Sequence, residues 1–435
     1  MKIVDIIEAK KNKKELSKAE IEYVIRNYHN GKISDKRMLE FIELINENTF
    51  TYKETYYMAY AMAMTGDTLN LSNDLGIIVD KHSAGAVSDA VTLVGIAVLS
   101  SLGVKTVKVL SERFGGFSHS LERFKLFHGF DAKINTEELK KNINNIGCGL
   151  LEETGQIAPV DIKLYNLRKQ ANIRTIPLVA SSILSKKIAT GANTVVFDVK
   201  CGEGGIFNSY EQSIRLAEYL VESAKLANIN VASIVSNLNQ PLGSSFGPRM
   251  EVEEAISVLN RDRTLYDAKL LQVAKELVAI SLMLAGVTNK KTRAFEMFDE
   301  AIETGIALAK FKEIISTYGG LYDNFINANL NLLDGIAVSY ITSDQSGIIT
   351  DILLKNITQS YKIISNNQKG KVDENAGFVV LVREGDKILK NQKIIRVCYS
   401  IDNENYSKCY SLLKTCVVAG RIKPKAVQPL YKIIL

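Results

Sequence analysis

The chain has 435 residues, of which 46% are hydrophobic and 23% are charged, and its formal net charge is +6. A chain of this length can bury a large core and should divide into two or three domains. Its basic residues are scattered and form no stripe interleaved with aromatic residues, so we expect no nucleic acid partner. The longest apolar run lies within residues 90–99 and is too short to span a bilayer, so we expect no membrane partner either.

The cysteines indicate a reducing compartment. The five cysteines form no CxxC pair and are odd in number. This pattern is typical of reduced cytoplasmic thiols and argues against a zinc site. The first residues lack the apolar stretch of a signal peptide, so we expect the protein in the cytoplasm.

The first 66 residues predict a small helical unit. Ser17 and Glu20 form a capping box, as do Thr51 and Glu54, and Ser34 offers a further cap. Apolar residues follow each cap at helical spacing, which predicts amphipathic helices. A second helical stretch, from residue 159 to about 188, could pack against these helices.

From residue 75 the pattern changes to short apolar runs that alternate with helices. This alternation predicts an α/β domain with a mainly parallel mixed sheet. Past residue 335 the strand content rises, which predicts a C-terminal α+β domain. The expected strands of the α/β domain are Leu75–Val79, Val104–Leu110, Thr194–Val199 and Val231–Val235. The expected domains are 1–66 with 159–190 (helical, with base and dimer contacts), 67–158 with 191–334 (α/β, phosphate-binding) and 335–435 (α+β).

The segment Asp80–Asp89 carries the clearest chemical signal. A lysine, a histidine and a serine follow an apolar run and precede the buried helical pattern of residues 90–99. A basic residue, a hydroxyl and the amides of a helix N-terminus together suit an anion. The alternative is an ordinary strand, turn and helix with an exposed Lys-His pair.

This segment resembles the phosphate loop of the thymidine and pyrimidine-nucleoside phosphorylases. Further blocks that resemble this family follow in the family's order, and the resemblance extends over essentially the whole chain. They are residues 153–168, 176–189, 198–207 and 240–243. The resemblance implies the family's fold and a homodimer formed through the N-terminal helices.

The family's glycine-rich signature is degenerate in residues 110–124. Ser118 and His119 stand where the family has paired glycines, and Ser120 stands where it has a threonine. Glycines in such loops allow positive φ and close approach of the backbone to a phosphate. The resemblance therefore implies altered phosphate binding at this loop.

By resemblance, Lys81, Ser83, Thr92 and Ser120 hold phosphate, with Lys108 as a further contact. Lysine supplies a point charge and the hydroxyls supply hydrogen-bond donors. Thr92 could instead bond to its own helix backbone, and Ser120 could be a simple N-cap. Ser111 is an alternative to the signature's serine.

By resemblance, Arg168, Ser182 and Lys186 bind the pyrimidine base and stabilise it as a leaving anion. His82 is the candidate general acid, or a hydrogen-bond donor to O2 of the base, because its unperturbed pKa is near neutrality. Lys186 and Lys187 could instead form a solvated helix face.

A monovalent cation such as K⁺ is a further expectation from the resemblance. The matching positions are Ser88, Ala90, Leu242, Ser245 and Glu254. Most of them would use backbone carbonyls, and Glu254 is expected to be an ordinary carboxylate on a helix surface. No other metal or cofactor is expected.

The resemblance implies a pentosyltransferase of pyrimidine salvage. Thymidine, deoxyuridine or uridine would react with inorganic phosphate to give the free base and (deoxy)ribose 1-phosphate, after closure of the helical domain on the α/β domain. The alternative is a non-catalytic or weakly active relative that binds pyrimidine nucleosides. A phosphoribosyltransferase is a third interpretation, which would need an acidic Mg²⁺-pyrophosphate site.

Overall fold

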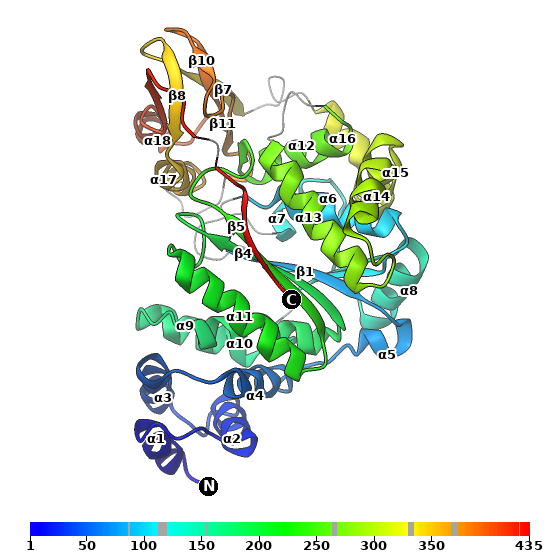
Figure 1. Cartoon of the computed structure of the whole chain (residues 1–435), viewed down its shortest axis with the longest axis vertical. Coiled ribbons are helices and arrows are strands. Elements are labelled where there is room, and N and C mark those ends of the chain that lie inside the picture. Colours follow the sequence, from blue (N-terminus) through cyan, green and yellow to red (C-terminus); the bar gives the residue numbers. More distant parts are fainter. Residues whose placement is uncertain are drawn as a thin grey trace.

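The computed structural model describes residues 1–85, 88–111, 120–153, 155–262, 268–328, 335–366, 373–425 and 427–435. The N-terminal helices lie at one end of the molecule, a large sheet flanked by helices lies in the middle, and small sheets lie at the other end (Figure 1). Within the described residues, no helix is both long and apolar enough to cross a membrane.

The N-terminal unit begins each of three helices at a predicted cap. Ser17 and Thr51 each form a complete capping box, and the Ser34 hydroxyl accepts a hydrogen bond from the Arg37 amide, so these predictions are confirmed. The helices are α1 (Ile3–Lys11), α2 (Lys18–His29), α3 (Asp35–Asn48) and α4 (Tyr52–Ala63).

Two helices from much later in the sequence pack against this unit. They are α9 (Val160–Gln170) and α10 (Ile176–Thr190). Val160, Leu164, Leu167 and Leu178 share one hydrophobic core with the N-terminal helices. The sequence positions of the domain boundaries remain a prediction.

A six-stranded sheet forms the centre of the molecule, in the order β13-β5-β4-β1-β2-β3. The five strands β1 to β5 pair in parallel, and β13 pairs antiparallel to β5. The strands are β1 (Val79–Ala84), β2 (Thr106–Leu110), β3 (Cys148–Glu152), β4 (Thr194–Cys201), β5 (Asn230–Asn237) and β13 (Leu430–Ile434). This arrangement confirms the predicted α/β class with a mainly parallel mixed sheet.

The first strand lies further along the chain than predicted. Residues Leu71–Leu75 form the short helix α5, which ends at Gly76 with a φ of 80°. The prediction of a strand over Leu75–Val79 is therefore wrong, since only Val79 belongs to β1. The consequence is that Lys81, His82 and Ser83 lie within the strand rather than after it.

Helices cover both faces of the sheet, because its strands are apolar on both sides. In β4, Val195 and Phe197 pack with one helix layer and Val196 packs with the other. Helices α10 and α11 lie on the first face, and α6, α12, α13 and α15 lie on the second (Figure 1). The remaining helices of this part are α6 (Ala90–Ser101), α7 (Ser120–Lys125), α8 (Thr136–Ile146), α11 (Tyr210–Leu226), α12 (Pro248–Leu259), α13 (Ala268–Leu284), α14 (Lys291–Glu303), α15 (Ile306–Thr317) and α16 (Tyr322–Asn327).

The C-terminal region contains two small antiparallel sheets, which confirms the α+β prediction. One has the order β10-β8-β12 and the other β6-β9-β11-β7. The strands are β6 (Ser245–Phe246), β7 (Ile336–Thr342), β8 (Gly347–Ile352), β9 (Gly377–Val380), β10 (Lys387–Ile388), β11 (Lys393–Ser400) and β12 (Val417–Gly420), with helices α17 (Leu354–Ile364) and α18 (Tyr406–Leu413).

The last strand of the chain, β13, does not belong to either of these small sheets. Strand β13, drawn in red, returns to the edge of the large sheet beside β5 (Figure 1). In the other direction, β6 leaves the α/β part to pair with β9. Two strand pairings, β13 with β5 and β6 with β9, therefore join the C-terminal region to the α/β part.

Candidate active site

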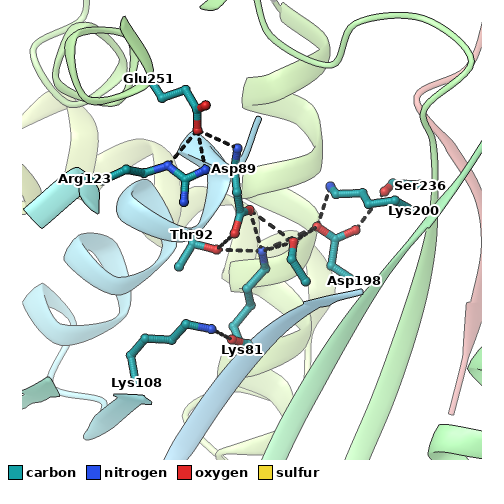
Figure 2. A network of polar contacts seen from close by, with 10 residues as sticks. Lys81, Asp89, Thr92, Lys108, Arg123, Asp198, Lys200, Ser236 and Glu251 are labelled. Carbon is teal, nitrogen blue, oxygen red and sulfur yellow. Dashed lines mark hydrogen bonds and ion pairs between the residues drawn. The ribbon is translucent and has the colours of Figure 1, made fainter. Parts of the chain in front are cut away.

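Lys81 is the centre of a buried polar cluster on β1. Its Nζ donates to Ser83 Oγ at 2.9 Å, Asp89 Oδ1 at 3.0 Å and Thr92 Oγ1 at 2.8 Å (Figure 2). The structure thus brings together three of the predicted phosphate residues. The Thr92 hydroxyl donates to Asp89 rather than to its own helix backbone, so the alternative interpretation of this threonine is wrong.

Two aspartates that the sequence reasoning missed complete the cluster. Asp89 precedes α6, and Asp198 lies on β4 within 3.5 Å of Lys81 Nζ. Asp198 also pairs with Lys200 at 2.6 Å and accepts from Ser236 at 2.7 Å. Both aspartates lie in the sequence blocks that resemble the family, but their positions in the sequence do not indicate which lysine each of them pairs with. Lys81 and Lys200 thus alternate with two carboxylates.

A third carboxylate, Glu251, holds the backbone of this cluster in place. Glu251 of α12 accepts from the Asp89 amide at 3.0 Å and from Arg123 Nε at 2.6 Å through Oε2 (Figure 2). Its Oε1 accepts from the Gly247 amide at 3.2 Å. Burial raises the pKa of Glu251, and Arg123 opposes this rise. The Glu251 carboxylate therefore joins α12, α7 and the start of α6.

Lys108 and His82 lie next to Lys81. Lys108 Nζ donates to the Lys81 carbonyl at 3.0 Å, and burial together with Lys187 lowers the pKa of Lys108 to about 8. Burial and four neighbouring lysines hold the pKa of His82 well below its usual value. His82 is therefore neutral at pH 7, which favours the role of N–H donor over that of general acid.

The glycine-poor signature lies mostly outside the described residues. Ser118 and His119 belong to the segment 112–119, which lies outside the described residues. Ser120 begins α7, and the Leu121 amide that follows it donates to the Ser111 carbonyl at 3.4 Å. The roles of Ser120 and Ser111 in phosphate binding remain predictions.

The predicted base residues come together on α9 and α10. Ser182 Oγ donates to Asp161 Oδ2 at 2.9 Å, and Lys186 Nζ lies 3.7 Å from the same oxygen. Lys186 also pairs at 2.9 Å with Glu153, which follows β3. Burial alone would lower the pKa of Lys186, but Asp161 and Glu153 raise it, so the ammonium group stays charged.

Arg168 is the third base residue and lies on α9 with Asp161. It is 7% exposed, and its Nε has no hydrogen-bond partner among the described residues. Burial lowers the pKa of Arg168, and Asp161 opposes this effect. A buried guanidinium nitrogen without a partner is costly, which is typical of a group that awaits a ligand.

Lys187 connects the helix of the predicted base residues to the strand of the predicted phosphate residues. It is 3% exposed, and its Nζ pairs at 2.6 Å with Asp80, the residue before Lys81. The Lys186 side chain is 24% exposed, and those of its partners Glu153 and Asp161 are 9% and 6% exposed. The alternative of a solvated face formed by Lys186 and Lys187 is therefore wrong.

The predicted cation residues are buried, and the structure links two of them. Glu254 is 1% exposed, so the expectation of a carboxylate on a helix surface is wrong. It accepts from the Ser244 and Ser245 amides at 2.7 and 3.2 Å, and burial raises its pKa to about 8. Ser88, Ala90 and Leu242 are also buried, but no described contact joins them to Glu254. In the described parts of the chain, no group of three or more His, Cys, Asp or Glu side chains could hold a metal ion.

The α/β part of this chain carries the domain of a glycosyl transferase family. A family described as "Glycosyl transferase family, a/b domain" matches residues 75–308. The pyrimidine-nucleoside phosphorylase of Staphylococcus haemolyticus is 31% identical over 93% of both chains, and that of Bacillus subtilis is 29% identical over 99% of both. The chain therefore belongs to the pyrimidine-nucleoside phosphorylase family, as the sequence motifs indicated.

A solved structure has a related fold. Anthranilate phosphoribosyltransferase from Thermus thermophilus aligns with a TM-score of 0.59, covering 72% of this chain and 99% of that chain. The sequence identity is 14%, so this likeness concerns the fold alone.

Proposed function

We propose that this protein catalyses the phosphorolysis of pyrimidine nucleosides, with inorganic phosphate as the second substrate. The observation that carries the proposal is the Lys187–Asp80 ion pair at 2.6 Å. It fixes the helix that bears Ser182 and Lys186 beside the strand that bears Lys81 and Ser83. A base site and an anion site held side by side suit transfer of a pentose from a base to phosphate.

On the anion side, phosphate would bind to Lys81, Ser83 and Thr92, with Lys108 and Ser120 as further contacts. Lys81 and the two hydroxyls converge, but they now bond to one another and to Asp89, so phosphate would have to take the place of some of these hydrogen bonds. Asp89 holds Lys81 and Thr92 in this arrangement. Phosphate would then attack C1′ of the sugar and displace the base.

On the base side, Arg168 and Lys186 would donate to carbonyl oxygens of the pyrimidine. Negative charge develops on the base as the glycosidic bond breaks, so a charged lysine binds the transition state more strongly than the substrate. His82 lies on β1 between the two sides and would donate an N–H hydrogen bond to O2 of the base. Its neutral imidazole can do so without taking up a proton first.

We further expect thymidine, deoxyuridine and uridine as substrates, and a cytoplasmic homodimer. The five cysteines are buried free thiols, which suits a reducing compartment. Glu254 lies buried beside Glu251, which raises its pKa further, and a monovalent cation such as K⁺ would stabilise its ionised form. Ser245, Ser88, Ala90 and Leu242 would complete such a site.

The test is phosphate-dependent release of thymine from thymidine and of uracil from uridine. Release that requires phosphate and yields the pentose 1-phosphate supports the proposal. Hydrolysis without phosphate contradicts it. If the protein binds these nucleosides but releases no base at any phosphate concentration, the alternative of a non-catalytic binding protein holds.

A further inference from the structure

Three serines of α10 differ in what their hydroxyls bond to. Ser181 Oγ donates to the Leu178 carbonyl at 3.2 Å, and Ser185 Oγ donates to the Ser182 carbonyl at 2.8 Å. Both side chains are 0% exposed. Ser182 is only partly buried, and it donates to a carboxylate, Asp161 Oδ2, at 2.9 Å. Ser182 is thus the serine of this run that is able to meet a ligand.

The Asp161 carboxylate decides how Ser182 can meet that ligand. A hydroxyl has a single proton, and an ionised carboxylate can only accept hydrogen bonds. Burial raises the pKa of Asp161, and Lys186 Nζ, 3.7 Å from the same oxygen, opposes this rise and stabilises the ionised carboxylate. Since its proton is committed to Asp161, Ser182 Oγ can offer a ligand only its lone pairs. Ser182 therefore acts as an acceptor.

The other two base residues act only as donors. The guanidinium of Arg168 and the ammonium of Lys186 have no lone pair to offer. Arg168 Nε is buried without a hydrogen-bond partner among the described residues. Arg168, Lys186 and Ser182 thus present two donor groups and one acceptor, and the His82 N–H would be a further donor to O2. Uracil and thymine complement this set, because their edge consists of two carbonyls and an N3–H. Cytosine has a bare N3 acceptor and an amino group instead.

We propose that Asp161 is a positioning residue that makes the base site prefer pyrimidines with an N3–H over cytosine. It does so by orienting the Ser182 hydroxyl. The inference rests on the proposed function, because it assigns the pyrimidine to this site. A cytosine ring would leave its N3 and the Ser182 lone pairs facing each other without a proton between them, and such a mismatch is strongly disfavoured in a buried site.

The experiment compares kcat/KM for uridine and cytidine. We expect the wild-type protein to favour uridine by at least about 100-fold. In Asp161→Ala the Ser182 hydroxyl can turn and donate to N3 of cytosine. The ratio of the two kcat/KM values should then fall at least about tenfold, beyond any common loss of rate. Equal losses for both nucleosides, with the ratio unchanged, would show that Asp161 has a structural role only and would overturn the proposal.

Two matched variants separate orientation from charge. Asp161→Asn keeps an acceptor oxygen for Ser182 and should keep the preference for uridine, even if turnover falls. Glu153→Gln removes the other carboxylate on Lys186, which makes no described contact with Ser182, and should also keep it. Loss of the preference in Glu153→Gln would assign the effect to the charge of Lys186 and contradict the proposal.

Binding of the free bases keeps this inference separate from the proposed function. Calorimetry with uracil and cytosine needs no turnover, so it applies even if the wild type releases no base. Tighter binding of uracil by the wild type, lost in Asp161→Ala, supports the inference, and equal binding of both bases by the wild type overturns it. If Asp161→Ala does not fold, Ser182→Ala serves instead, since it removes the acceptor itself and should also reduce the preference.

Discussion

The two sides of the candidate site are built in different ways. On the anion side, residues from β1, β4, α6 and α12 hold one another in a continuous network of alternating charges (Figure 2). On the base side, Asp161 of α9 contacts Ser182 and Lys186 of α10, and part of Arg168 is left without a partner among the described residues. A change on the anion side should therefore spread through the network, whereas a change on the base side should stay local and affect selectivity.

The largest effect is expected for Lys81→Met, because Lys81 donates to three side chains of the network. Its loss leaves Asp89 and Asp198 facing each other without the charge between them. We expect kcat for phosphorolysis to fall by roughly 10³-fold, the upper end of the range for the loss of one donor that stabilises developing charge. Steady-state kinetics at varied phosphate would measure it. Lys105→Met, on a lysine that bonds to Leu75 and Asn144 instead, is the control and should keep its activity.

His82 lies between the two sides, and its replacement tests whether it donates an N–H or a proton. We expect His82→Ala to lower kcat by about 10²-fold, at the low end for a positioned acid or base. Because the His82 pKa lies well below 6.5, the wild-type kcat should show no step between pH 6 and 7.5. A step near pH 6.5 that disappears in His82→Ala would restore the general-acid role.

Glu251→Gln tests whether the anion side acts as a connected network. Glutamine has no charged oxygen to accept the hydrogen bonds from Arg123 and the Asp89 amide. The start of α6 should therefore be held less firmly to α12. We expect the KM for phosphate to rise about tenfold, the scale of one or two lost charge-assisted hydrogen bonds, while the KM for nucleoside changes little. Glu253→Gln is the matched control on the same helix, since Glu253 pairs with Arg249 and Arg396 outside the network. An equal rise in both KM values in Glu251→Gln would contradict a separate anion side.

The lowered pKa of Lys108 predicts how phosphate affinity depends on pH. Its pKa is lowered to about 8, so it is charged below pH 8 and neutral above. Phosphate affinity should therefore fall as the pH rises from 7 to 9, by roughly threefold to tenfold if one positive contact is lost. In Lys108→Met the affinity should be lower throughout and lack this fall. In the unfolded chain Lys108 stays protonated up to about pH 10.5, whereas in the folded protein it loses its proton near pH 8. The free energy of unfolding should therefore increase between pH 8 and 10.5, because the cost of burying a charged Lys108 disappears.

The smallest effect concerns the helical support of the base side. Thr51→Ala removes the N-cap of α4, which packs in the same core as α9, and should lower the free energy of unfolding by about 1 kcal/mol. Chemical denaturation would measure this loss. The ratio of activities on uridine and cytidine should not change, because Asp161 and Ser182 keep their contact. A changed ratio would mean that the base side is coupled to the N-terminal helices.

Local sequence determined much of the fold. The capping boxes at Ser17 and Thr51 begin helices as predicted, because side chain and backbone bond within four residues. The helix Thr136–Ile146 ends at Gly147, whose φ is 75°. The error at β1 has a local cause as well. A short apolar run fits a helix end or a strand equally well, and Gly76 divides this one.

Long-range pairing could not be predicted in the same way. Strand β13 joins the large sheet almost 200 residues after β5, and its own sequence pattern does not indicate that it pairs with β5. The same holds for the carboxylates of the site. Asp89, Asp198 and Asp161 stand in recognisable motifs, yet their pairing with Lys81, Ser182 and Lys186 depends on which strands and helices become neighbours.

The sequence by itself determined the family, the α/β class and the identity of the lysines, serines and arginine that could bind substrates. Motif residues carry this information directly, since residue type fixes charge and hydrogen-bonding capacity. Only the tertiary structure decided the protonation of His82, the burial of Lys187 and the direction of the Ser182 hydrogen bond. These properties arise from desolvation and from charges brought close by folding, and neither is a property of residues taken one at a time.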